Sequence, residues 1–152
     1  MKPLRLLLEV HRATHRIGLF LDVADPPLEV SQGEAHLLAW LLEAGDAPMS
    51  ALHAAFAHKR STLTSYVDRL EAKRLVRREL RPEDRRSFRV CLTSTGKSLA
   101  TRVHRHLEAL EAAALGTMSE RDVEGFAKVV TALIEASEHK ASKKGRKEQE
   151  EA

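Results

Sequence analysis

Apolar residues recur with a helical period along most of the chain, and this pattern predicts six helices. The first covers residues 3–22, where the apolar positions span an arc wide enough to need more than one partner surface. The second starts at a Ser31–Glu34 capping box and runs to about Ala44. The others are predicted at the following positions: 50–58, 59–73, 94 to Gly116, and from Ser119 onward.

Between the fourth and fifth helices the period changes to an alternation of apolar and polar positions, which is typical of strands. The alternation places Val76, Arg78 and Leu80 on one side of a first strand, and Phe88, Val90 and Leu92 on one side of a second. Residues 82–85, Pro-Glu-Asp-Arg, include residue types that favour turns. We therefore predict a mainly α fold with a small β-hairpin wing, a winged helix-turn-helix flanked by N- and C-terminal helices.

Positive charge is concentrated in this middle part of the chain. The whole sequence has a net charge of only +3, but residues 59–89 contain eleven basic and five acidic residues, a net +6, so the remainder is slightly acidic. A concentrated basic surface on a near-neutral body indicates a polyanionic partner.

The predicted helix 59–73 has the two faces that a DNA-reading helix needs. Its apolar face packs inward, and the opposite face has hydroxyl and basic side chains that can contact phosphates and base edges. These candidate major-groove residues are Lys59, Arg60, Ser61, Thr62, Thr64, Ser65 and Arg69. Taken alone, the pattern also fits an ordinary solvated surface helix.

The hairpin that follows favours the DNA interpretation. It is rich in arginine, and a two-stranded ribbon can insert guanidinium groups into the electronegative minor groove. The candidate wing residues are Arg81, Asp84, Arg85 and Arg86, with the Asp84 carboxylate able to hold Arg86 by a charge-assisted bond.

Five residues of the hairpin and the next helix match a known signature, Asp-x-Arg-x5-Leu-Thr-x2-Gly. They are Asp84, Arg86, Leu92, Thr93 and Gly96. Through this motif and the preceding helix, the chain resembles the MarR-type winged-helix transcription regulators. The resemblance implies that Arg86 enters the minor groove, that Asp84 positions it, and that Thr93 and Gly96 are structural.

The resemblance also implies a domain plan and partners. One domain would cover residues 1–137, with a DNA-binding lobe at 31–93 and dimerisation helices at 3–22 and 94–137. The partners would be a second copy of the chain and a double-stranded, pseudo-palindromic DNA operator, with repression released by a small-molecule effector. No residue identifies that effector.

Residues 138–152 have no large apolar side chain and are predicted to be a flexible charged tail or a frayed helix extension.

Three positions depart from the family pattern, one of them His53, which stands where the helix-turn-helix often has alanine. Arg74 stands where a glycine often ends the recognition helix, so we expect that helix to end without a left-handed cap. Ala57 stands where the helix-turn-helix often has glycine, which puts the tightness of that turn in question.

Other functions find less support in the sequence. There is no Gly-rich phosphate loop, nucleophile elbow or convergent His–carboxylate pair, so we predict no enzyme, no cofactor and no metal site, although His11 and His15 are one helical turn apart. Cys91 is expected to be a passive, half-buried thiol rather than a redox sensor. A winged-helix interaction module without DNA binding is the alternative function.

The sequence also bears on location. The apolar start of the chain is interrupted by Glu9 and His11, unlike an export signal, and no apolar run is long enough to span a membrane. We therefore expect a cytoplasmic protein without a membrane partner.

Overall fold

The computed structural model describes the backbone of residues 4–81 and 84–150, and the side chains of residues 4–80 and 88–138. The predicted turn residues Pro82 and Glu83 lie outside this range. The chain divides into two compact units, residues 1–109 and 110–152, with the boundary inside one helix, and each unit is described by itself.

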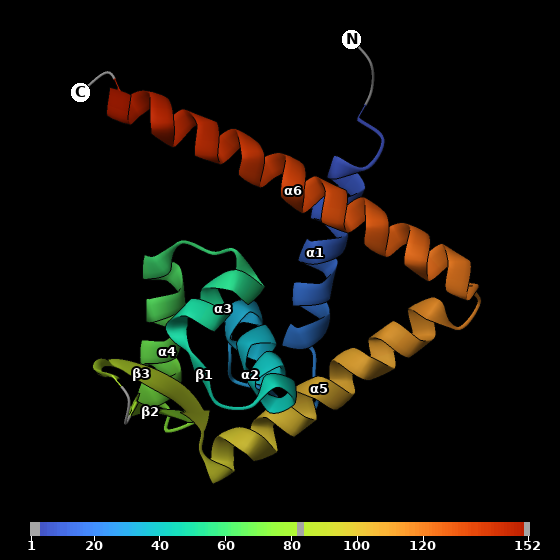
Figure 1. The fold of residues 1–152 in the computed structure, drawn as a ribbon. Helices are drawn as coiled ribbons and strands as arrows, with labels where there is room; N and C mark the ends of the chain where they lie inside the picture. Colours follow the sequence, from blue (N-terminus) through green and yellow to red (C-terminus); the bar gives the residue numbers. More distant parts are fainter. Residues whose placement is uncertain (1–3, 82–83, 151–152) are drawn as a thin grey trace. The chain divides into compact units, whose positions relative to one another are not determined.

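Six helices and three strands form the described part of the chain (Figure 1). Their order is α1 (Leu7–Asp22), α2 (Gln32–Ala44), β1 (Ala47–Pro48), α3 (Met49–Phe56), α4 (Arg60–Ala72), β2 (Val76–Arg81), β3 (Asp84–Leu92), α5 (Ser94–Leu115) and α6 (Glu120–Glu150). The predicted fold class, mainly helical with a small wing, is confirmed.

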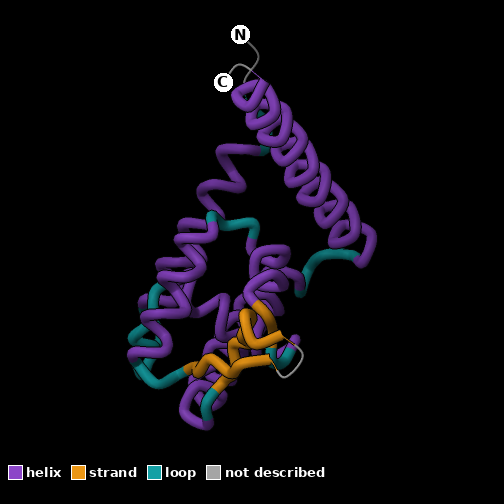
Figure 2. The backbone as a smooth tube through the Cα atoms, turned by 60° about the vertical axis from the view of Figure 1, so that its left-hand side comes forward, coloured by secondary structure: helices purple, strands orange, loops and turns teal. Residues whose placement is uncertain are grey.

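The strands form one antiparallel sheet in the order β1-β3-β2, drawn in orange in Figure 2. β2 pairs with β3 from Val76 opposite Leu92 to Leu80 opposite Phe88, and the register then shifts between Leu80 and Arg81. Val76 and Val90 are buried, as the alternation predicts, but Leu80 is 71% exposed because the hairpin extends beyond the core there. Strand β1 was not predicted.

The core of residues 1–109 is built from the inner faces of α2, α3, α4 and the sheet. Its fully buried side chains include Leu37, Leu52, Leu63, Leu70 and Val90. A smaller cluster around Leu21, Ala35 and Val103 joins α1, α2 and α5. The burial of these apolar side chains fixes α4 with its polar face outward.

The end of α4 corrects one expectation from the sequence. Arg74 adopts a left-handed conformation, with φ of 58°. The Leu75 amide donates to the Leu70 carbonyl oxygen and the Arg74 amide to that of Glu71, the two bonds of a Schellman motif. The helix therefore ends in a left-handed cap although the residue is arginine, because these bonds and the core contact of Leu75 require that turn.

The turn of the helix-turn-helix is tight because it also contains a non-glycine residue in the left-handed conformation. Ala57 is left-handed, with φ of 51°, and its amide donates to the His53 carbonyl oxygen. An L-residue with a Cβ pays a conformational cost in this region, which a glycine would avoid.

Thr93 and Gly96 join the wing to α5, in agreement with their predicted structural role. The Thr93 hydroxyl oxygen accepts from the Gly96 amide at 3.0 Å, and it lies 2.7 Å from the Arg74 carbonyl oxygen, to which it donates. A Cβ on Gly96 would overlap the Leu75 carbonyl oxygen. Only glycine lets α5 start this close to the end of the α4–β2 turn.

The second unit, residues 110–152, contains the end of α5 and the whole of α6. The α6 backbone is helical to Glu150, so the charged segment from residue 138 continues the helix, and its flexibility stays a prediction. On this helix, Phe126 is 64% and Ile134 is 48% exposed. Across the described residues, no helix is both long and apolar enough to cross a membrane.

Candidate nucleic-acid interface

The N-terminal half of α4 presents a polar, positively biased surface. Lys59 is the N-cap residue, no side chain caps the helix start, and the first turn contains no acidic residue. The side chains of Lys59, Arg60, Ser61, Thr64 and Ser65 are exposed, and that of Thr62 is half-buried. An uncapped helix start with basic neighbours attracts phosphate, because its free amides and the helix dipole both favour a negative charge.

The hydroxyls of this surface are held in defined positions. The Thr64 hydroxyl donates to the Arg60 carbonyl oxygen and the Ser65 hydroxyl to that of Ser61, each at 2.9 Å. Their oxygen lone pairs stay available as acceptors toward solvent or a base edge. Two hydroxyls of the predicted reading face thus have intrahelical partners.

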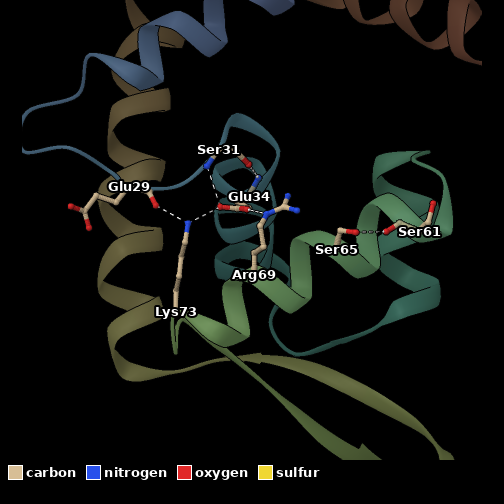
Figure 3. A network of polar contacts seen from close by, with 7 residues as sticks. All are labelled: Glu29, Ser31, Glu34, Ser61, Ser65, Arg69 and Lys73. Atoms are coloured by element: carbon tan, nitrogen blue, oxygen red, sulfur yellow. Dashed lines mark hydrogen bonds and ion pairs between the residues drawn. The ribbon is translucent and has the colours of Figure 1, made fainter.

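Arg69, the last predicted residue of this face, has a partner inside the protein. Its Nε donates to Glu34 Oε1 at 2.5 Å, and Lys73 Nζ donates to Glu34 Oε2 at 3.1 Å (Figure 3). The Glu34 side chain is buried, and it also completes the predicted capping box with Ser31. Burial raises the pKa of Glu34, but the hydrogen bonds from Arg69, the Ser31 amide and Lys73 outweigh it and lower that pKa.

The sequence analysis identified Glu34 only as a helix cap. The ion pairs with α4 were missed because Arg69 lies 35 positions along the chain from Glu34. The one signal was the i, i+4 spacing of Arg69 and Lys73, which places two cations on one helix face.

A second ion-pair cluster connects α4 to the wing. Arg78 of β2 contacts Asp68 at 2.5 Å and also Glu71, both on α4, and its guanidinium lies over the Phe88 ring. Burial lowers the pKa of Arg78, and the two carboxylates raise it above its usual value on balance. Arg78 is therefore part of the scaffold, holding the base of the wing against α4.

The predicted wing residues are described only in part. Arg81 ends β2 and Asp84 starts β3, and the two are register partners. The side chains of Arg81, Asp84, Arg85 and Arg86 lie outside the described residues, so their contacts with DNA stay predictions.

Cys91 is more buried than expected, at 1% exposure. Burial raises its pKa to about 11, and the carboxylates of Asp46 and Glu79 add to the shift. Asp46 immediately precedes β1, the strand that the sequence pattern did not reveal. A thiol with this pKa is protonated at neutral pH and is a poor nucleophile, which supports the passive role.

The histidines on α1 and α5 differ in exposure and contacts. His11 and His15 are exposed on α1, whereas His104 contacts Glu43 at 2.7 Å and His106 stacks on Phe20. Among the described residues, no group of three or more His, Cys, Asp or Glu side chains could hold a metal ion.

A cavity of about 640 Å³ lies within residues 1–109, between the α1–α2 loop, the end of α4 and the start of α5. Its lining combines apolar side chains, such as Leu28 and Leu99, with the cations Lys73 and Arg102. The volume lies within the range of small-molecule sites.

Comparison with known proteins confirms the family resemblance. Residues 30–88 match the MarR family, and this segment covers α2, α3, α4 and most of the wing. A search of curated protein sequences finds no significant match.

Solved structures share the fold over most of the chain. A putative MarR family transcriptional regulator from Listeria monocytogenes, complexed with a 26mer DNA, is 17% identical with a TM-score of 0.77, covering 90% of this chain and 89% of that one. The S. aureus MepR–DNA complex is 18% identical with a TM-score of 0.75, and the match covers 88% of this chain and 99% of that one. The transcription regulator MarR from Oenococcus oeni PSU-1 is 19% identical with a TM-score of 0.71, and the match covers 86% of this chain and 96% of that one. The winged helix-turn-helix of this chain is thus of the MarR type.

Proposed function

We propose that this protein is a non-enzymatic transcription regulator that binds double-stranded DNA sequence-specifically, with α4 in the major groove and the wing in the adjacent minor groove. The observation that carries the proposal is the start of α4. Its uncapped, acid-free first turn presents Lys59, Arg60 and Ser61 to solvent, and the hydroxyls of Thr64 and Ser65 follow one turn later. The MarR family match and the DNA complexes among the similar structures support the same reading.

We further propose that it acts in the cytoplasm as a dimeric repressor on a pseudo-palindromic operator, with half-sites about one helical turn apart. The exposed apolar residues of α1 and α6 support a dimer, since each unit alone leaves them uncovered. The cavity beside the end of α4 supports regulation by a small effector. An effector bound there would contact Lys73 and could change how α4 is held.

A titration against duplex DNA at several salt concentrations tests the DNA-binding proposal. Affinity should fall steeply with salt, because each neutralised phosphate releases counterions. Arg60→Ala should weaken binding and reduce the log–log salt slope by about 1. Arg86→Ala tests the wing in the same assay, and it should weaken binding to duplexes with a narrow minor groove most.

Arg105→Ala removes the same charge from an exposed position on α5 and is the matched control. The alternative, a winged-helix interaction module without DNA binding, predicts weak and sequence-independent duplex binding that neither Arg60→Ala nor Arg86→Ala changes. That result would overturn the proposed function.

A further inference from the structure

We propose that Glu34 is a positioning residue for DNA binding, which sets the orientation of α4 through Arg69 and Lys73. In this view the two basic side chains act through Glu34 rather than by direct contact with DNA phosphates. The inference rests on the proposed DNA-binding function and assigns a different role to Arg69 from the one that its place in the sequence suggests.

The Glu34 carboxylate connects three segments of the chain. It lies at the start of α2 with 1% exposure, and it is the one charged side chain that is buried among those the structure describes. Oε1 accepts from Arg69 Nε at 2.5 Å, and Oε2 accepts from the Ser31 amide and from Lys73 Nζ, both at 3.1 Å. Lys73 Nζ also donates to the Glu29 carbonyl oxygen at 2.8 Å.

Because Glu34 is buried, losing these contacts would be energetically unfavourable. A buried carboxylate that loses its cationic partners is left with an uncompensated charge in a medium of low polarity, which is strongly unfavourable. If Arg69 and Lys73 both turned toward DNA phosphates, Glu34 would be left in that state. Arg69 is further held by its position over the Tyr66 ring, 5.2 Å from the ring centre.

The cluster fixes the half of α4 that does not read DNA. Arg69 and Lys73 are one turn apart at the C-terminal end of the helix, and Figure 3 shows both reaching toward Glu34 while Ser61 and Ser65 lie at the other end. Gly33 of α2 packs closely on the Tyr66 ring of α4, and a Cβ there would overlap that ring. The direction of the reading face therefore depends on the Glu34 contacts.

Glu34→Gln distinguishes the effect of the Glu34 charge on DNA binding from the effect of the side chain's shape. Glutamine keeps the size of the side chain and can still accept from the Ser31 amide as a capping-box residue, but it removes the charge that holds Arg69 and Lys73. The probe is a duplex selected from a random pool by the wild-type protein. We expect Kd for this duplex to rise by on the order of tenfold, with the salt slope unchanged, because no phosphate contact is lost.

A double-mutant cycle tests whether Arg69 acts through Glu34. Arg69→Gln alone should also weaken binding without changing the salt slope, and the Glu34→Gln/Arg69→Gln double variant should bind no more weakly than the weaker of the two single variants. Additive losses, or a slope reduced by about 1 in Arg69→Gln, would show a direct phosphate contact and overturn the inference. Arg69→Gln leaves Lys73 on Glu34, so this arm remains informative if Glu34→Gln does not fold.

Loss of stability alone must be excluded as the cause. Val103→Ala, in the buried cluster of α1, α2 and α5, destabilises the same unit away from α4. In urea titrations Val103→Ala should be at least as destabilised as Glu34→Gln, yet folded Val103→Ala should keep the wild-type Kd. Equal losses of affinity in both variants overturn the inference. A wild-type protein that binds no duplex refutes the proposed function instead.

Discussion

Six of the eleven basic residues in the segment 59–89 fall into two groups with different physical roles. Four of them, Arg69, Lys73, Arg77 and Arg78, form ion pairs with acidic side chains of the protein itself. Lys59 and Arg60 pair with no other described side chain and lie at the start of α4. The charge available to a polyanion is therefore more localised than the net +6 of the segment indicates.

Arg74 offers a stability test at a single residue. Because it holds a left-handed conformation with φ of 58°, Arg74→Gly should raise the free energy of unfolding by about 1 kcal/mol, the cost that glycine avoids there. Ala72→Gly, two residues earlier at a helical φ, is the control and should lower stability by up to about 1 kcal/mol. Urea denaturation measures both, and a less stable Arg74→Gly would contradict the Schellman assignment.

At the scale of elements, the contact between the start of α5 and the α4–β2 turn depends on one glycine. A Cβ on Gly96 would overlap the Leu75 carbonyl oxygen, so Gly96→Ala should force these segments apart and destabilise the protein by roughly 2–4 kcal/mol, as steric overlap in a packed site does. The Tm and the urea midpoint should both fall.

Gly125→Ala is the matched control for Gly96→Ala. Gly125 lies in α6, and a Cβ there meets no atom within 4 Å, so alanine should be neutral or stabilise the helix by up to about 1 kcal/mol. If Gly96→Ala behaved like Gly125→Ala, the close approach of α5 to the turn would be wrong.

What could be predicted from the sequence depended on the range of the interaction. The capping box of Ser31 and Glu34 was predicted because its partners are three residues apart, and the helices because their apolar period is regular. Strand β1 has two residues and no period, so it became visible only through its pairing with β3. The ion pairs of Glu34 with α4 are likewise non-local and depend on how the helices pack.

The candidate site followed the same division. The reading face of α4 was predicted from its helical period, and the exposure of Lys59, Arg60 and Ser61 agrees with it. Arg69 was grouped with these residues because the period places it on the flank of the same face, yet its guanidinium contacts a carboxylate of α2. The sequence pattern shows which side chains lie outside the core, but not which of them contact a side chain of another helix or strand.

On the scale of the whole molecule, each compact unit leaves apolar side chains exposed. In residues 1–109 they include Leu7 and Leu8 on α1, and in the second unit Val123, Phe126 and Ile134 on α6. Exposed apolar area of this extent is unfavourable in water and is typical of a protein–protein interface. We therefore expect these helices to be covered by a second copy of the chain.

Phe126→Glu tests this expectation, because a carboxylate placed in an apolar interface loses its hydration without gaining a partner. The variant should be monomeric, or should dissociate at a protein concentration at least tenfold higher than the wild type, in sedimentation or light-scattering experiments. Lys128→Glu introduces the same carboxylate, with a charge change of two units instead of one, at another exposed position of α6 and should leave the assembly intact. A Phe126→Glu monomer would also have one reading helix instead of two, so its operator affinity should fall even though α4 is unchanged. A Phe126→Glu variant that remains dimeric would place the interface elsewhere than on this face of α6.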